Sequence, residues 1–299
     1  MEKECNLIVT LPNLNDENSI NEMINCEEIS SFRFNSGVNQ LMSNHEIVEK
    51  LLSIREISGK KIWIDLKGRQ LRVKSWGDVN YECIELNHNI DIEYPAYVLF
   101  RDGSKCEIIR CRGNKILLSS CPFHAVGKGQ SLNICAKSLN INGYLTDEDK
   151  ELIKIGSEFG FNDYMASFVE EYGDLSEIIN LNKNANVISK IESMKGIDFV
   201  LRNNCYLNLM AARDDLFINS DCSYEIINYL KYIISKDKDA VCASRIFSSL
   251  CKSGLFSLSD YTDLEFMYLL GYRTFMLQDD VKGDTLKLVL KGFGDFKRG

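Results

Sequence analysis

Two side chains of opposite charge, Lys190 and Glu192, stand two residues apart in an apolar run. If that run is a β-strand, both side chains project to the same face. Charged groups on the inside of a sheet are costly to bury without partners, so the pair indicates either a functional site or a structural salt bridge. Asp215 follows the next apolar run and can bring a second carboxylate to the same edge. The two carboxylates predict a site for Mg²⁺ or Mn²⁺, beside which Lys190 would stabilise charge developing on the substrate.

Short apolar, β-rich runs recur along the chain with helical stretches between them. They cover residues 7–11, 31–35, 61–66, 163–168, 187–192, 207–212, 240–244 and 273–278. Strand and helix in alternation imply a parallel sheet, and eight such units imply closure into a (β/α)8 barrel, or TIM barrel. One helical stretch, residues 146–160, begins with the capping pattern of Thr146 and Asp149.

Residues 73–138 break this alternation, and we call them the β insert. Strand-like runs occur at 81–86, 97–101, 106–111 and 115–119, with hairpin signals at Asp102-Gly103 and Gly113-Asn114. The sequence therefore predicts a barrel domain from residues 1–72 and 139–299, and a small all-β domain inserted after the third barrel strand. An insert at that end of a barrel lies over the active-site face, where a lid domain would sit. The alternative is an insertion with no role in chemistry.

The predicted strand ends carry a concentrated set of polar residues, as expected where a barrel does its chemistry. These ends read Arg33-Phe34-Asn35, Asp65-Leu66-Lys67-Gly68, Lys190-Ile191-Glu192, Arg213-Asp214-Asp215, Ser244-Arg245 and Gln278-Asp279-Asp280. No phosphate-binding GxxxxGK[ST] loop is present, and no GxGxxG follows the first strand. The three histidines lack metal-ligand spacing, so histidine-based catalysis is not indicated.

Composition narrows the expected partners and compartment. The net charge of −8 argues against a broad surface for nucleic acid or an acidic membrane. The 11 cysteines form an odd, scattered set that favours a reducing cytoplasm over a disulfide framework. The start of the chain shows no signal-peptide pattern, and no apolar run is long enough to span a membrane. A cytoplasmic protein that acts on a small molecule is therefore expected.

Eight segments, in their order and spacing, resemble the motifs of the pyruvate kinase family over nearly the whole chain. They are LIVTLP (7–12, the family's opening strand and its turn), SFRFNS (31–36, family A-R-x-N-F-S-H), DLKGRQLR (65–72, D-T-K-G-P-E-I-R), GKGQSL (127–132, K-G-V-N-L), ASFV (166–169), ISKIE (188–192, I-x-K-I-E), ARDDL (212–216, A-R-G-D-L) and VCASR (241–245, I-C-A-T-Q). The family's C-terminal regulatory domain has no counterpart here. A family-type tetramer is therefore not assumed, although a homo-oligomer stays open.

The resemblance implies a metal-dependent phosphotransferase that moves a phosphoryl group between a nucleotide (ATP or ADP) and an enolate, keto acid or related small molecule. Lys190 would stabilise the transferring group and the enolate, and Glu192 and Asp215 would hold the divalent metal. The other implied roles are phosphoryl contact by Arg33, proton delivery involving Ser244, monovalent-cation and nucleotide contacts by Asn35 and Asp65, and hinge and lid positions for Arg72 and Lys128. Such catalysis works by positioning and charge neutralisation.

Several residues depart from the family pattern. Asp214 replaces the glycine whose amide region holds the substrate carboxylate in the family, so an acid there should repel phosphoenolpyruvate unless its side chain turns away. Leu66 and Gln70 replace a threonine and a glutamate, so a K⁺ requirement is not carried over. Arg245 replaces a glutamine and is free to bind another anionic group. These changes favour a substrate other than pyruvate.

Two other functions remain open. A metal-dependent lyase or aldolase acting through a pyruvate-like enolate would also use a glutamate and an aspartate on adjacent strands. The retained β insert argues against that reading, because a lid that returns through Lys128 suits closure over a nucleotide. The other alternative is a non-catalytic pyruvate kinase-like protein. The retention of Lys190, Glu192 and Asp215 together argues against it.

Overall fold

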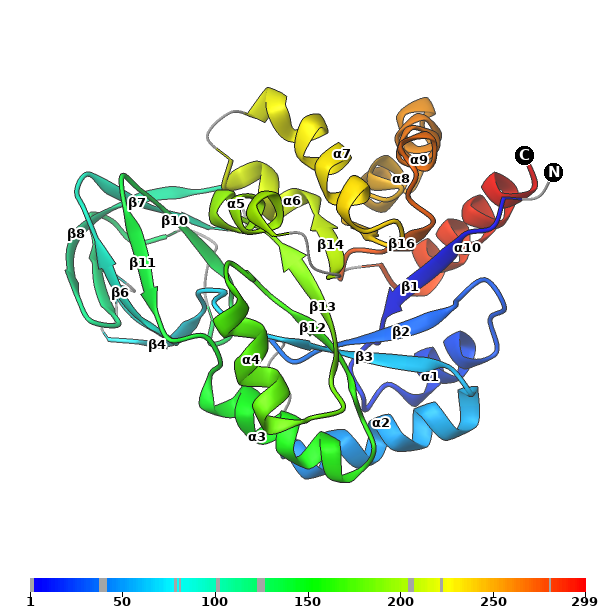
Figure 1. The fold of residues 1–299 in the computed structure, drawn as a ribbon, viewed down its shortest axis with the longest axis horizontal. Coiled ribbons are helices and arrows are strands. Elements are labelled where there is room, and N and C mark those ends of the chain that lie inside the picture. Colours follow the sequence, from blue (N-terminus) through cyan, green and yellow to red (C-terminus); the bar gives the residue numbers. More distant parts are fainter. Residues whose placement is uncertain are drawn as a thin grey trace.

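A computed structural model describes residues 3–37, 42–77, 80, 82–100, 103–122, 127–203, 207–220, 223–279 and 281–299. Eight parallel strands close into a barrel in the order β1-β16-β15-β14-β13-β12-β3-β2 (Figure 1). They are β1 (Asn6–Thr10), β2 (Ser31–Asn35), β3 (Lys61–Leu66), β12 (Asp163–Ala166), β13 (Asn186–Ile191), β14 (Asn208–Ala212), β15 (Val241–Ala243) and β16 (Thr274–Met276). The eight-stranded parallel barrel predicted from the sequence is confirmed.

Helices surround this barrel. They are α1 (Glu17–Ile24), α2 (Asn44–Ser58), α3 (Asp147–Glu158), α4 (Tyr172–Leu181), α5 (Met194–Arg202), α6 (Arg213–Ile218), α7 (Ile226–Lys236), α8 (Ser248–Ser253), α9 (Leu258–Leu270) and α10 (Gly283–Arg298), with a 3-10 turn at Ser223–Glu225. The predicted capping box of α3 is confirmed, because Asp149 N donates to Thr146 Oγ1 and Thr146 N donates to the Asp149 carboxylate. Among the described helices, none is long and apolar enough to cross a membrane.

The barrel interior is divided into an apolar layer and a polar layer. The apolar layer consists of Ile8, Trp63, Met165, Ile188, Met210, Val241, Ala243 and Met276. Asp65 and Lys190 lie two residues beyond Trp63 and Ile188 on the same strands, so they share the inward face one layer higher. The apolar layer thus closes the barrel beneath a set of charged side chains.

The β insert projects from one end of the barrel, away from the two chain termini (Figure 1). Its strands are β4 (Val73–Trp76), β5 (Cys83–Leu86), β6 (Asn89–Ile92), β7 (Ala96–Phe100), β8 (Lys105–Arg112), β9 (Lys115–Leu118) and β10 (Leu132–Ala136). Six of them form an antiparallel sheet in the order β10-β7-β8-β9-β5-β4, over an apolar cluster of its own. β6 pairs with β11 (Leu139–Asn142), so the paired β structure continues four residues past the boundary at 138.

The four runs predicted as strands in the β insert correspond to β5, β7, β8 and β9. The predicted hairpin at Gly113-Asn114 is confirmed between β8 and β9. Tyr81, Arg101 and Asp102, which belonged to those predictions, lie outside the described residues. The sequence prediction did not include β4, β6, β10 or β11.

Candidate functional site

A cavity of about 650 Å³ lies between the C-terminal ends of the barrel strands and the β insert. All nine residues predicted for the site are in the described part of the chain, and eight of them line this cavity. Those eight are Arg33, Asn35, Arg72, Lys128, Lys190, Glu192, Asp215 and Ser244. The ninth, Asp65, is buried beneath the cavity, where it contacts two of the others.

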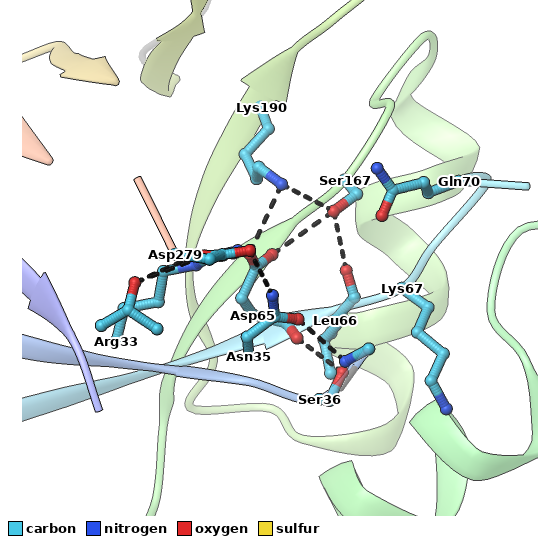
Figure 2. A network of polar contacts seen from close by, with 12 residues as sticks. Arg33, Asn35, Ser36, Asp65, Leu66, Lys67, Gln70, Ser167, Lys190 and Asp279 are labelled. Atoms are coloured by element: carbon cyan, nitrogen blue, oxygen red, sulfur yellow. Dashed lines mark hydrogen bonds and ion pairs between the residues drawn. The ribbon is translucent and has the colours of Figure 1, made fainter. Parts of the chain in front are cut away.

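A continuous row of charged and polar groups joins several of the residues that line the cavity (Figure 2). Lys190 Nζ lies 3.4 Å from Asp65 Oδ2, and the same oxygen accepts Arg33 Nε at 2.7 Å. Arg33 also forms an ion pair with Asp279, whose Oδ2 accepts Asn35 Nδ2 at 2.9 Å. The row therefore joins β13, β3, β2 and the segment after β16 into one network.

The two cations of this row are held permanently charged. Burial alone would lower the pKa of Lys190, but the carboxylates of Asp65 and Glu192 outweigh it and raise that pKa. Burial opposes the charge of Arg33 in the same way, and Asp279 and Asp65 more than offset it, so its pKa is also raised. Ser167 adds a neutral contact, with its Oγ 2.9 Å from Lys190 Nζ. Lys190 is thus suited to stabilise negative charge and not to donate its proton at neutral pH.

Glu192 is almost wholly buried at the cavity floor, with 1% of its surface exposed. One carboxylate oxygen lies 3.1 Å from Lys190 Nζ, and the other accepts the backbone N–H of Phe168 at 2.6 Å. Burial raises the pKa of Glu192 to about 7, against the attraction of Lys190 and with further help from the negative charge of Asp215. A carboxyl group that titrates near neutrality is ready to lose its proton when a cation arrives.

This pKa leads to a prediction about stability in the absence of divalent metal. Because the pKa in the folded protein lies above that of an unfolded glutamate, the stability due to protonated Glu192 is complete below pH 4.5 and is lost as pH rises through 7. At pH 8 in EDTA, Glu192→Gln should therefore unfold with a free energy about 3 kcal/mol higher than wild type. At pH 4, below both pKa values, the two proteins should be equal. Urea denaturation at both pH values measures this, and equal stabilities at pH 8 would contradict it.

The carboxyl groups at the cavity floor are of the kind that could hold a divalent cation together with substrate oxygens. Among the described residues, no group of three or more His, Cys, Asp or Glu side chains is arranged to hold a metal. Mg²⁺, however, is commonly bound by only one or two carboxylates together with water and substrate oxygens. The mutual repulsion of Glu192 and Asp215 is the feature that a cation would relieve. The floor also carries four carboxyl groups, Asp65, Glu192, Asp215 and Asp279, against the two cations Arg33 and Lys190.

Arg72 contributes a positive charge at the junction between the barrel and the β insert. Its Nη1 donates to Gly37 O at 3.2 Å and to Gly129 O at 2.7 Å, and its Nη2 donates to Gln70 Oε1. None of these acceptors is charged, and among the described residues its guanidinium forms no ion pair. Its Nε is buried without a hydrogen-bond partner, and burial lowers its pKa. Arg72 is thus a cation on the cavity wall that an anionic ligand can neutralise.

Ser244 lies in a backbone turn that buried Arg213 holds in place. Ser244, Arg245 and Phe247 all have positive φ values, of 68°, 59° and 51°, a region that non-glycine residues seldom adopt. Arg213 Nε donates to Ser244 O at 3.1 Å, and its Nη1 pairs with Asp263 at 2.7 Å. Strained turns of this kind cluster at functional sites, and this one sets Ser244 against the cavity.

Asp214 and Arg245, two departures from the family pattern, contact each other. Their side chains form an ion pair between the start of α6 and the turn after β15. The Arg245 guanidinium also lies 5.2 Å from the centre of the Phe217 ring. Asp214 lines the cavity, and its negative charge is offset there by Arg245, a residue of the chain itself.

Three residues of the site were not singled out from the sequence. Asp279 holds Arg33 and Asn35, Ser167 contacts Lys190, and Asn219 contacts the backbone of Glu192. Asp279 carried a signal in the acidic run that follows the eighth strand, and Ser167 lay within a segment matched to the family. Asn219 carried none, because it ends α6 as an ordinary helix C-cap would. No protein-family model matches the chain.

Proposed function

We propose that the chain is a metal-dependent phosphotransferase that transfers a phosphoryl group between a nucleotide and a small enolate-forming molecule, in the manner of pyruvate kinase. The observation that carries the proposal is the convergence of eight residues, chosen by resemblance to that family, on a single cavity. These residues come from separate strand ends and from the β insert. Their convergence is what a shared active site requires.

The charges in the cavity support a ligand with two different ends. The carboxyl groups of Glu192 and Asp215 suit a divalent cation on the barrel side. Arg72, whose acceptors among the described residues are all uncharged, and exposed Lys128 suit phosphate groups on the side of the β insert. A metal-bound nucleotide laid across the cavity would meet both requirements, with the β insert acting as a lid that excludes water.

Each side chain then has a definite task. A divalent cation at Glu192 and Asp215 would supply Lewis-acid charge neutralisation. Lys190, fixed by Ser167, Asp65 and Glu192, would present its ammonium group to the phosphoryl and enolate oxygens at a constant position. Ser244 would take part in proton delivery. This division of labour is that of phosphoryl transfer, in which positioning and electrostatics replace covalent catalysis by the protein.

The proposal is tested by thermal shift with Mg²⁺ or Mn²⁺ combined with ADP, ATP or oxalate. A ligand that binds only the folded protein raises its melting temperature. We expect metal-dependent stabilisation by a nucleotide and, separately, by oxalate as an enolate mimic. The absence of any shift with every ligand would refute the proposal.

Replacing Arg72 with methionine should weaken binding of Mg²⁺-ADP at least tenfold. The loss follows from removing a charged hydrogen-bond donor, which is worth about 1.5–3 kcal/mol. Titration calorimetry measures this effect. Arg110→Met, which removes an exposed arginine on β8 outside the cavity, is the matched control and should bind as wild type does. Equal affinity of the two variants would remove Arg72 from the nucleotide site.

One observation favours a second function, a metal-dependent lyase or aldolase. Arg33 is saturated by Asp65 and Asp279, so a phosphoryl group could reach it only by displacing one of them. Enolate chemistry at Glu192, Asp215 and Lys190 alone needs no such exchange. The lyase would exchange the methyl protons of pyruvate with deuterium from solvent in the presence of Mn²⁺ and without any nucleotide. Proton NMR distinguishes the two functions, because the phosphotransferase should need a nucleotide or phosphate for this exchange.

A further inference from the structure

Asn219, the residue that ends α6, lies where three parts of the site meet. Its side-chain Nδ2 is 2.9 Å from Asp215 O, 3.2 Å from Glu192 O and 3.4 Å from Asn133 Oδ1. The first two are backbone oxygens of the two residues assigned to the cation. Asn133 belongs to β10 of the β insert and lines the cavity.

The orientation of this amide is fixed by chemistry. Backbone carbonyl oxygens only accept hydrogen bonds, so the group that faces Glu192 O and Asp215 O must be the NH₂ group. That group has two hydrogens for three acceptors. The contact with Asn133 is the longest and competes for them with the two backbone contacts. Movement of β10 therefore changes how firmly the backbone is held at Glu192 and at Asp215.

The β insert is also fastened on the far side of the cavity. There Arg72 Nη1 joins Gly37 O of the barrel to Gly129 O of the insert. A side chain on Gly37 would overlap the Arg72 guanidinium, so the close approach depends on glycine at this position. Of these two contacts between the barrel and the β insert, the one through Asn219 also reaches the backbone of Glu192 and Asp215.

We propose that Asn219 is a positioning residue that couples the seating of the β insert to the placement of the Glu192 and Asp215 carboxylates. The inference rests on the proposed function, because it takes that pair to bind a divalent cation. Groups that orient metal ligands without touching the metal commonly change its affinity 10- to 100-fold when they are removed. Asn219 would do so from the main-chain side while sensing the position of β10.

The test measures the dissociation constant of Mn²⁺ alone for the full-length, metal-depleted protein, from the electron paramagnetic resonance signal of free Mn²⁺. Asn219→Ala should raise this constant about 10- to 100-fold. The matched control is Asn203→Ala. Asn203 ends α5 and donates from Nδ2 to Phe199 O at 2.7 Å, so its removal deletes a similar helix-end contact elsewhere. The control should bind Mn²⁺ within twofold of wild type.

A second variant leaves the end of α6 intact. Asn133→Ala removes only the competing contact from the β insert, which leaves the Asn219 NH₂ group to the two backbone oxygens, and should lower the Mn²⁺ dissociation constant about two- to tenfold. Added to Asn219→Ala, it should have no further effect, since the two side chains act through one contact.

Each outcome bears on a distinct claim. Equal Mn²⁺ affinities of Asn219→Ala and Asn203→Ala, with wild type binding the ion, would reduce Asn219 to a helix cap and overturn the inference. Wild-type affinity in Asn133→Ala would overturn the coupling to the β insert. Failure of the wild-type protein itself to bind Mn²⁺ would overturn the proposed function instead.

Discussion

Lys190→Met should lower the rate of phosphoryl transfer by about a thousandfold or more, while the barrel remains folded. Lys190 is the only one of the cavity's described cations that lies within 3.1 Å of a proposed metal ligand, and its raised pKa keeps it charged at neutral pH. Removing one preorganised group of this kind typically costs 10²- to 10³-fold in turnover. Lys190 is also proposed to contact the enolate, and removing this second contact lowers turnover further. Steady-state kinetics, with the substrate found by the thermal-shift screen, provide the measurement.

Lys183→Met is the matched control for this variant. Lys183 is exposed after α4, and its Nζ donates to Asn180 Oδ1 at 2.9 Å, its one hydrogen bond within the described part of the chain. The control should retain wild-type turnover. If Lys190→Met transfers phosphate as fast as the control does, while its circular dichroism matches wild type, Lys190 has no catalytic role.

The largest effect on stability is expected from Asp65→Asn. Asp65 compensates both Lys190 and Arg33, and all three side chains are at most 8% exposed. Asparagine has the shape of aspartate but no charge. The variant therefore removes the carboxylate that the buried cations Lys190 and Arg33 share. Breaking a buried ion pair by removing one partner costs about 3–5 kcal/mol. Urea denaturation at pH 7 should show a loss of that size.

The comparison for Asp65→Asn is Asp163→Asn. Asp163 pairs with Lys61 at 3.0 Å, but the side chains are 25% and 47% exposed. Its substitution should cost no more than about 1 kcal/mol. If both variants lost the same small amount, the charged row would contribute nothing to the stability of the barrel.

The barrel could be predicted from the sequence because its strands are short apolar runs separated by amphipathic helices. The predicted bounds of β2 and β3 match the structure, since charged or polar residues end both runs sharply. β15 is shorter than its run, because Ser244 turns into a left-handed conformation. β6 and β11 were missed because each has only two apolar residues, alternating with asparagine or aspartate. Their pairing with each other is what makes them strands.

The position of the site was predictable, and several of its contacts were not. Strand ends of a barrel gather at one face, so Arg33, Lys190 and Glu192 could be expected to meet there. The sequence treats Asp214 and Arg245 as two separate departures, 31 residues apart, and only the fold brings them into one ion pair. Asp279 likewise pairs with Arg33 only because the barrel closes between β1 and β16. No local sequence pattern reveals this contact.

The charged row also constrains the order in which the molecule can be made. Arg33 lies near the start of the chain and its partner Asp279 near the end, 246 residues away. β1 pairs with β16 at the same seam. During synthesis, the nascent barrel is therefore open, and Arg33 has Asp65 but not Asp279, until the last strand leaves the ribosome. Closing the sheet and completing the cavity floor are consequently one event, so a chain truncated before β16 should lack both the closed barrel and the site.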